Sequence, residues 1–265
     1  MQLTLISGIF AVLFYLTGLG FQVMKFVSNK DSRRLVLAFG GLAVITHSIS
    51  ASGIIRTPTG YHFGIVEIST LIAVSISILV LISSLRKPLD NLFLGLFPLA
   101  IITIVVSLTF NSTLPPTNLG AGLASHVLLS ILAYSFITIA AVQAAFLAYQ
   151  NYQLKHGHAG GIVRKLPPLQ DMETFLFELL WVGQVLLSLG IIAGVMFIDD
   201  IWGLDGVIHK TFFSILAWLV FAVLLWGRHQ LGWRGSTAIR WTLIGFALLL
   251  VGFYGTKFAL EYIIV

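Results

Sequence analysis

The chain has 265 residues, of which 58% are hydrophobic and 9% are charged, and its mean hydropathy is +0.99. Because about a quarter of the residues in an ordinary soluble domain are charged, this composition excludes that class and predicts a protein surrounded by membrane lipid. The formal charge of +5 does not indicate a nucleic-acid partner, since the basic residues lie in short loops between apolar segments. The absence of cysteine excludes disulfides, thiolate metal sites and thioether links to a cofactor.

Apolar runs of about 20 residues, the length that crosses a bilayer, recur along the whole chain. They predict an all-α fold, a polytopic membrane helix bundle of about eight transmembrane helices; the short alternating segments of a membrane β-barrel are absent. The first run lacks basic residues before it and a small-residue cleavage site, so we interpret it as a retained span and not as a signal peptide. The predicted spans lie near residues 3–26, 35–55, 65–85, 92–110, 122–149, 174–198, 208–226 and 241–262.

The basic residues fall mainly on one side of these spans. Only Arg56, Lys210 and Lys257 of the 15 lysines and arginines lie on the other side. Because basic loops stay in the cytoplasm, the odd-numbered loops are predicted to be cytoplasmic and both termini to face outside. The 12 residues on the cytoplasmic side are Lys25, Lys30, Arg33, Arg34, Arg86, Lys87, Lys155, Arg164, Lys165, Arg228, Arg234 and Arg240.

We expect a single integral membrane domain over residues 1–265. Five helices (1–149) and three helices (173–265) flank a cytoplasmic loop at 150–172. The loop contains two histidines, three glycines and the pair Pro167-Pro168, which is typical of a flexible linker. His156 and His158 are two residues apart and could bind a metal, but a solvated polar loop explains them as well.

Three histidines lie in or at the ends of the apolar spans. His47 is nine residues before Arg56, which places it ~13 Å below the predicted outer boundary. His126 lies about one turn inside the fifth span, and His209 stands at the outer start of the seventh. An imidazole in a bilayer is costly unless it meets a polar partner, a cavity, a metal or a haem. Each of the three could equally be a structural residue that bonds to a neighbouring helix.

Other polar residues are also predicted on the outer side. The cations Arg56, Lys210 and Lys257 could pair with nearby acids or with the carboxylates of an anionic ligand. Lysines at helix ends also extend to the membrane surface by default, and Trp202 could belong to an interfacial belt of aromatic residues. The sequence contains no phosphate-binding glycine loop, serine-elbow or zinc-protease motif, so we do not expect an enzyme. The predicted outer acids are Glu67, Asp199, Asp200 and Asp205.

Residues 126–255 resemble the cytochrome c assembly proteins (the CcsA/CcmC/CcmF group), in particular the YpjD/HemX-like inner-membrane branch. Residues 125–134 resemble the histidine-bearing helix before the family's tryptophan-rich loop, and residues 187–194 resemble the helix that leads into it. Trp202 and Gly203 stand where the tryptophan-rich motif begins, followed by Lys210-Thr211 and Ala217-Trp218. The next two motif tryptophans and the late outer histidine are missing.

The resemblance implies a multi-pass protein of the bacterial inner membrane that handles haem at the outer membrane face. It implies haem b with His126 as one axial ligand of the iron, and His209 or His47 is our candidate for the other. Arg56 and Lys210 would neutralise the propionates, and Trp202 would cover the porphyrin. Because the motif is truncated, we expect haem binding and not haem transfer. The expected partners are membrane lipid and haem or cytochrome c assembly components, with no nucleic acid.

Two other functions remain open from the sequence. The chain could be a subunit or accessory of divalent-cation transport or homeostasis, in which the outer acids gather the cation and the histidines line its path. No carboxylate lies in the middle of a span, which speaks against a transport path. The chain could also be a membrane scaffold whose haem site has decayed.

Overall fold

A computed structural model describes residues 2–28, 32–86, 89–110, 115–157, 160–161, 163–197 and 207–262. Over these ranges the protein contains eight helices that are long and apolar enough to cross a membrane, which confirms the predicted spans. Their long apolar sequences favour helices, because a helix satisfies every backbone hydrogen bond within its own segment when no water is present. The chain divides into two compact units, Met1–Asn118 and Leu119–Val265.

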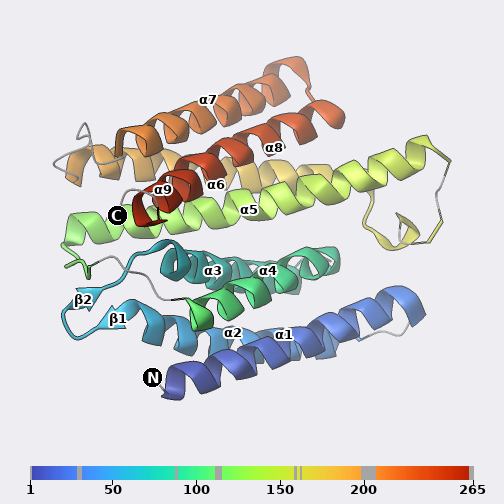
Figure 1. The fold of residues 1–265 in the computed structure, drawn as a ribbon. Coiled ribbons are helices and arrows are strands. Elements are labelled where there is room, and N and C mark those ends of the chain that lie inside the picture. Colours follow the sequence, from blue (N-terminus) through green and yellow to red (C-terminus); the bar gives the residue numbers. More distant parts are fainter. Residues whose placement is uncertain are drawn as a thin grey trace. The chain divides into compact units, whose positions relative to one another are not determined.

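Unit 1 consists of four long helices and a short hairpin (Figure 1). Its elements are α1 (Gln2–Ser28), α2 (Arg33–Ile55), β1 (Arg56–Thr57), β2 (Gly60–Tyr61), α3 (Ile65–Arg86) and α4 (Asp90–Thr109). The most extensive packing joins α1 to α2, and α4 packs on both α1 and α3. At the first turn of α4, Asp90 forms ion pairs with Lys25 and Arg33. These pairs neutralise the carboxylate at the predicted cytoplasmic end, where the helix dipole also favours a negative charge.

The hairpin of unit 1 was not anticipated from the sequence. β1 and β2 pair in antiparallel register, and Tyr61 forms a further bridge with Thr117. Gly60 has a φ of 151°, and a Cβ atom there would lie 2.8 Å from the carbonyl oxygen of Thr117. A glycine is therefore required at this position, both for its backbone conformation and for the close approach of residue 117.

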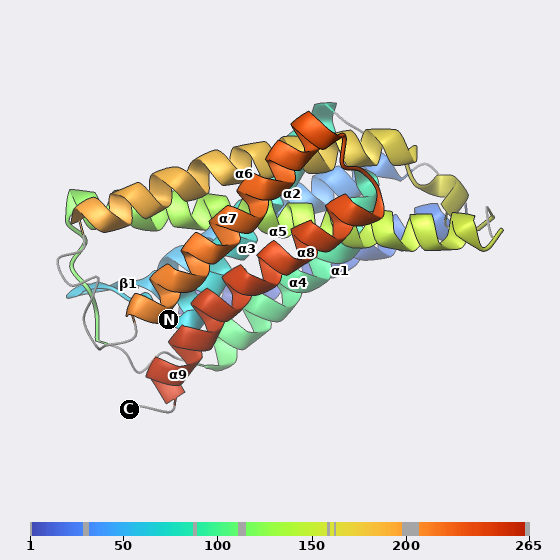
Figure 2. The same ribbon diagram turned by 90° about the horizontal axis from the view of Figure 1, so that it is seen from above.

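Unit 2 is built on two long helices that pack along each other, α5 (Ala121–Lys155) and α6 (Leu169–Phe197). The remaining elements are η1 (Val163–Lys165), α7 (Val207–Leu231), α8 (Ser236–Leu250), the π-helix η2 (Val251–Gly255) and α9 (Thr256–Tyr262). Helices α7 and α8 lie side by side at an angle to α5 and α6 (Figure 2). Glycine allows the close packing of α6 on α5, since a Cβ at Gly183 would lie 2.8 Å from the side chain of Ile137.

Several helices of unit 2 extend beyond the spans predicted from hydropathy. The fifth span was expected to end at residue 149, but α5 continues to Lys155, and α6 begins at Leu169 instead of residue 174. The polar residues at these ends find partners and so remain helical: Gln150 Nε2 donates a hydrogen bond to the Pro167 carbonyl oxygen at 3.1 Å. A prediction from hydropathy ends the span at these polar residues, but the helix continues past them.

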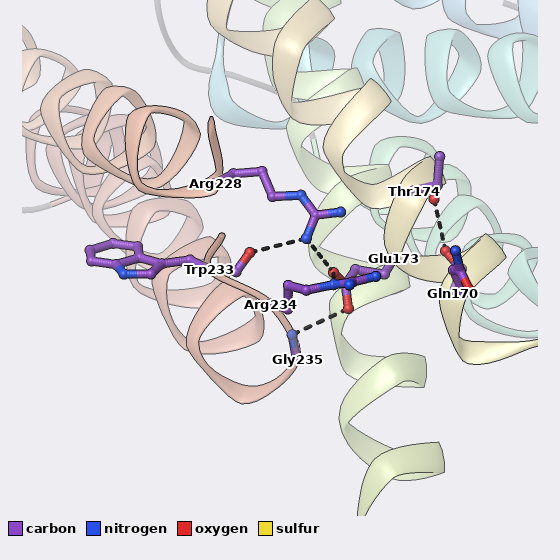
Figure 3. A network of polar contacts seen from close by, with 7 residues as sticks. All are labelled: Gln170, Glu173, Thr174, Arg228, Trp233, Arg234 and Gly235. Atoms are coloured by element: carbon purple, nitrogen blue, oxygen red, sulfur yellow. Dashed lines mark hydrogen bonds and ion pairs between the residues drawn. The ribbon is translucent and has the colours of Figure 1, made fainter. Parts of the chain in front are cut away.

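A polar network joins α6 to the turn between α7 and α8. The carboxylate of Glu173 accepts hydrogen bonds from Arg228 (2.8 Å), Arg234 (3.2 Å) and the backbone N–H of Gly235 (3.2 Å). Arg228 also donates to the carbonyl oxygen of Trp233 and lies 4.6 Å from the ring centre of Phe177. Figure 3 shows both guanidinium groups directed at the one carboxylate. This Glu173 cluster fixes the end of unit 2 that is predicted to face the cytoplasm.

Candidate functional site

Helices α5 and α7 begin, and α6 and α8 end, at the same end of unit 2, which we call the His126 end. Here His126, in the second turn of α5, is partly buried, and its Nδ1 lies 2.8 Å from the carbonyl oxygen of Gly190 in α6. A carbonyl oxygen can only accept a hydrogen bond, so Nδ1 carries the proton and donates it. The other ring nitrogen, Nε2, is then left with a lone pair in the neutral imidazole. The contact therefore sets both the orientation and the tautomer of His126.

Lys210 brings a positive charge to the same end. Its ammonium group lies 5.3 Å from the ring centre of Phe253, and its charge is near enough to repel Lys257 of α9 and a protonated His126. A cation over an aromatic face is attracted by the ring quadrupole, so Phe253 holds Lys210 in place. The structure thus brings together two of the residues singled out from the sequence, His126 and Lys210.

The π-helix η2 positions the aromatic residues of this end. Tyr134 of α5 donates a hydrogen bond of 2.7 Å to the carbonyl oxygen of Leu249, near the end of α8, and its ring lies 5.4 Å from that of Phe253 in η2. A single π-helical turn within an α-helix is frequent at functional sites. Tyr134 and Phe253 were missed by sequence reasoning, because neither hydropathy nor spacing distinguishes a π-helical turn from ordinary helix.

The second candidate ligand of unit 2, His209, is exposed in the first turn of α7, beside Lys210. Trp202, which was predicted to cover a porphyrin, lies outside the described residues. The same holds for the acids Asp199, Asp200 and Asp205 of the cation-transport alternative. Within the described ranges, no group of three or more histidine, aspartate or glutamate side chains could hold a metal ion.

The remaining candidates belong to unit 1. His47 is buried on α2, with 1% of its surface exposed, and its Nδ1 lies 3.4 Å from the hydroxyl of Tyr15. Its Nε2 is also buried and has no hydrogen-bond partner among the described residues. The packing around His47 leaves no open face of the imidazole for a flat ligand. Arg56 is exposed in β1, where α2 ends, and Glu67 is buried in the first turn of α3.

The sequence profile of the Cytochrome C assembly protein family matches residues 8–264, nearly the whole chain. The chain belongs to this family. It is 28% identical to the inner membrane protein YpjD of Escherichia coli (strain K12) over 233 residues, 86% of this chain and 88% of that protein. It is 29% identical to the protein HemX of Brevibacillus brevis over 137 residues, 50% of this chain and 49% of that protein.

A third relative is the cytochrome c biogenesis protein CcsA of Prochlorococcus marinus (strain AS9601). The two chains are 25% identical over 201 residues, which cover 67% of this chain and 63% of that protein. No solved structure matches. The family match confirms the resemblance seen in residues 126–255 and extends it to the first four helices. The chain is thus a multi-pass inner-membrane protein of the cytochrome c assembly family.

Proposed function

We propose that the protein binds haem b at the His126 end of unit 2, with His126 as one axial ligand of the iron. The observation that carries this proposal is the hydrogen bond from His126 Nδ1 to the Gly190 carbonyl oxygen. Histidines that ligate metals almost always donate their other ring N–H to a carbonyl or carboxylate, which fixes the tautomer and orients the ring. His126 already donates such a hydrogen bond, so it fits the role of an axial ligand.

His209 is our preferred second ligand. It is exposed at the start of α7 and precedes Lys210, which interacts with His126 within the same unit. His47 is the alternative, but its side chain is almost fully buried in unit 1, and using it would require its contact with Tyr15 to open. Two imidazole ligands fill both axial positions, an arrangement that suits holding haem or transferring electrons.

The lysines at the His126 end would bind the haem propionates. Lys210 is held over Phe253 close to His126, and Lys257 adds a second positive charge from α9. Charge-assisted hydrogen bonds to carboxylates are about twice as strong as neutral ones, so these lysines would orient the macrocycle. Phe253 and Tyr134 pack against each other in the core of the unit and support this end from within. Trp202 and Arg56 remain further candidates for this site, and the proposed partners are haem and components of cytochrome c assembly.

The experiment is an absorption spectrum of detergent-purified protein after expression with ample haem. We expect a sharp Soret band for the parent chain and its loss in the variant His126→Gly, with partial recovery on addition of imidazole. The matched control is His156→Ala, an exposed histidine that also bonds to a backbone carbonyl, that of Tyr152, and whose loss should leave the spectrum unchanged. A colourless parent protein, or a His126→Gly variant that keeps the full band, would contradict the proposal.

A further inference from the structure

One hydrogen bond of Tyr134 reaches the backbone of α8 across 115 positions of the chain. The hydroxyl donates to the carbonyl oxygen of Leu249 at 2.7 Å, and the tyrosine is 8% exposed. Leu249 is the second-last residue of α8, and the π-helix η2 begins two residues later, at Val251. In a regular α-helix this carbonyl accepts from the N–H four residues on, that of Phe253. The phenol therefore brings a competing donor to the entrance of η2.

A competing donor at this point gives a physical reason for the irregular turn. Side chains that insert into the hydrogen-bond ladder distort a helix, and π-turns occur as single turns within α-helices. Tyr134 is itself held firmly, because it lies within α5, which packs along α6. On the other side of the turn, a Cβ at Gly252 would lie 2.6 Å from the Cβ of Phe213, so η2 rests directly on α7. The turn is thus held between α5 and α7.

The same turn carries the ring that holds Lys210. Phe253 is 4% exposed, and its ring centre lies 5.4 Å from that of Tyr134 and 5.3 Å from the Lys210 ammonium group. Successive side chains of an α-helix differ in direction by about 100°. A return of residues 251–255 to regular α-helix would shift the register by one residue and turn Phe253 away from Lys210. The hydroxyl of Tyr134 therefore determines the position of a charge that it does not touch.

This charge lies beside His126, whereas Tyr134 lies deeper. The two residues are eight positions apart on α5, a rise of ~12 Å. The charge of Lys210 is near enough to act on His126 electrostatically. Because Tyr134 is buried, its effect on a ligand held at His126 passes through η2 and Lys210.

We propose that Tyr134 is a positioning residue of the His126 end: through η2, its hydroxyl fixes Lys210 where the site recognises a carboxylate of its ligand. A cation that is already held in place loses less side-chain entropy when the carboxylate binds. The site then prefers a porphyrin with free propionates to the same porphyrin with esterified ones. This preference rests on the haem function proposed above, whereas the position of Lys210 does not.

The position of Lys210 can be measured without any ligand. Reductive methylation of the full chain in detergent with ¹³C-formaldehyde gives dimethyl-lysines, which keep their charge. Methyl groups over an aromatic ring resonate upfield, so the parent should show an upfield signal that is absent from Lys210→Arg and Phe253→Leu. Tyr134→Phe, which keeps the ring and loses the hydroxyl, should lose this upfield shift. The control Thr242→Val, which removes a buried hydroxyl bond to the Ala238 carbonyl in regular α8, should keep it. A parent without the upfield signal, or an unchanged signal in Tyr134→Phe, would overturn the proposal.

Titration with haem and with its dimethyl ester measures the preference for a carboxylate. We expect the parent to bind haem about tenfold more tightly than the ester, the factor that one charge-assisted hydrogen bond provides. Tyr134→Phe should lower this ratio to the value found for Lys210→Ala, and Thr242→Val should keep the ratio of the parent. A merely structural role would weaken the binding of both porphyrins in equal proportion. That result, or the full ratio in Tyr134→Phe, would count against the role of Tyr134. A parent that binds neither porphyrin would contradict the haem function and the preference for a carboxylate, and the lysine signal would then decide the role of Tyr134 alone.

Discussion

His126 and His47 look alike in the sequence, as single histidines in apolar helices, but they have different surroundings. His126 donates to a backbone carbonyl that can only accept, and this leaves Nε2 as a possible ligand atom. His47 is enclosed, with its Nδ1 facing the hydroxyl of Tyr15, a group that can donate or accept. A fixed tautomer on a partly exposed ring suits ligation, and a fully packed ring suits the core. Hydrogen-bond partners thus separate residues that composition cannot.

The second axial ligand of the proposed haem can be identified by substituting each candidate in turn. We expect His209→Ala to convert a low-spin haem spectrum into a broader, blue-shifted high-spin one, because the iron loses one of two imidazoles. His47→Phe should leave the spectrum as it is. Optical and electron paramagnetic resonance spectra of the two purified variants would show this. The opposite result, high-spin haem in His47→Phe only, would assign the role to His47.

At the scale of elements, the Glu173 cluster ties α6 to the turn between α7 and α8. Glu173→Gln should destabilise unit 2, because Arg228 and Arg234 lose their shared counter-charge. Since the arginine side chains are 28% and 57% exposed, solvent screening lowers the cost, and we expect about 1–3 kcal/mol. Thermal unfolding in detergent would measure it. Asp171→Asn, an exposed acid in the first turn of the same helix, should cost less than about 1 kcal/mol.

The close contact of α8 with α7 depends on Gly245, because glycine has no side chain. A Cβ at Gly245 would lie 2.5 Å from the ring of Phe221, which is 1% exposed and cannot move aside. We expect Gly245→Ala to destabilise the protein by about 1–3 kcal/mol through overpacking. Gly41→Ala on α2 is the control, because nothing lies within 4 Å of its Cβ position and alanine favours helix. Equal unfolding temperatures for both variants would contradict the argument.

The sequence predicted some of these elements and not others, for physical reasons. Eight spans could be found because lipid requires an unbroken apolar helix in each crossing. The hairpin at residues 56–61 and the π-helix at 251–255 depend on tertiary contacts, such as Tyr61 with Thr117 and Tyr134 with Leu249. These partners lie 56 and 115 residues apart in the chain, so no local pattern reveals them. The same applies to the bond between His126 and Gly190, on which the proposed site depends.

For the whole molecule, the distribution of basic residues predicts which ends face outside. The hairpin of unit 1 lies in the second loop, and the His126 end of unit 2 adjoins the fourth and sixth loops, so both are predicted to be external. The Glu173 cluster and the loop after α5 are predicted to be cytoplasmic. A haem site that serves cytochrome c assembly outside the membrane requires this orientation. The reverse orientation would put His126 and Lys210 on the cytoplasmic side and remove that role.

Single introduced cysteines can test this orientation directly, because the chain contains none of its own. Thr59, in the turn of the hairpin, and Gly160, in the loop after α5, are both exposed, so neither substitution disturbs packing. We expect a membrane-impermeant maleimide to label Thr59→Cys in intact spheroplasts and to label Gly160→Cys only after permeabilisation. The parent chain should not be labelled in either case. Labelling of Gly160→Cys in intact spheroplasts, with protection of Thr59→Cys, would reverse the topology, since the reagent reaches only the external thiol.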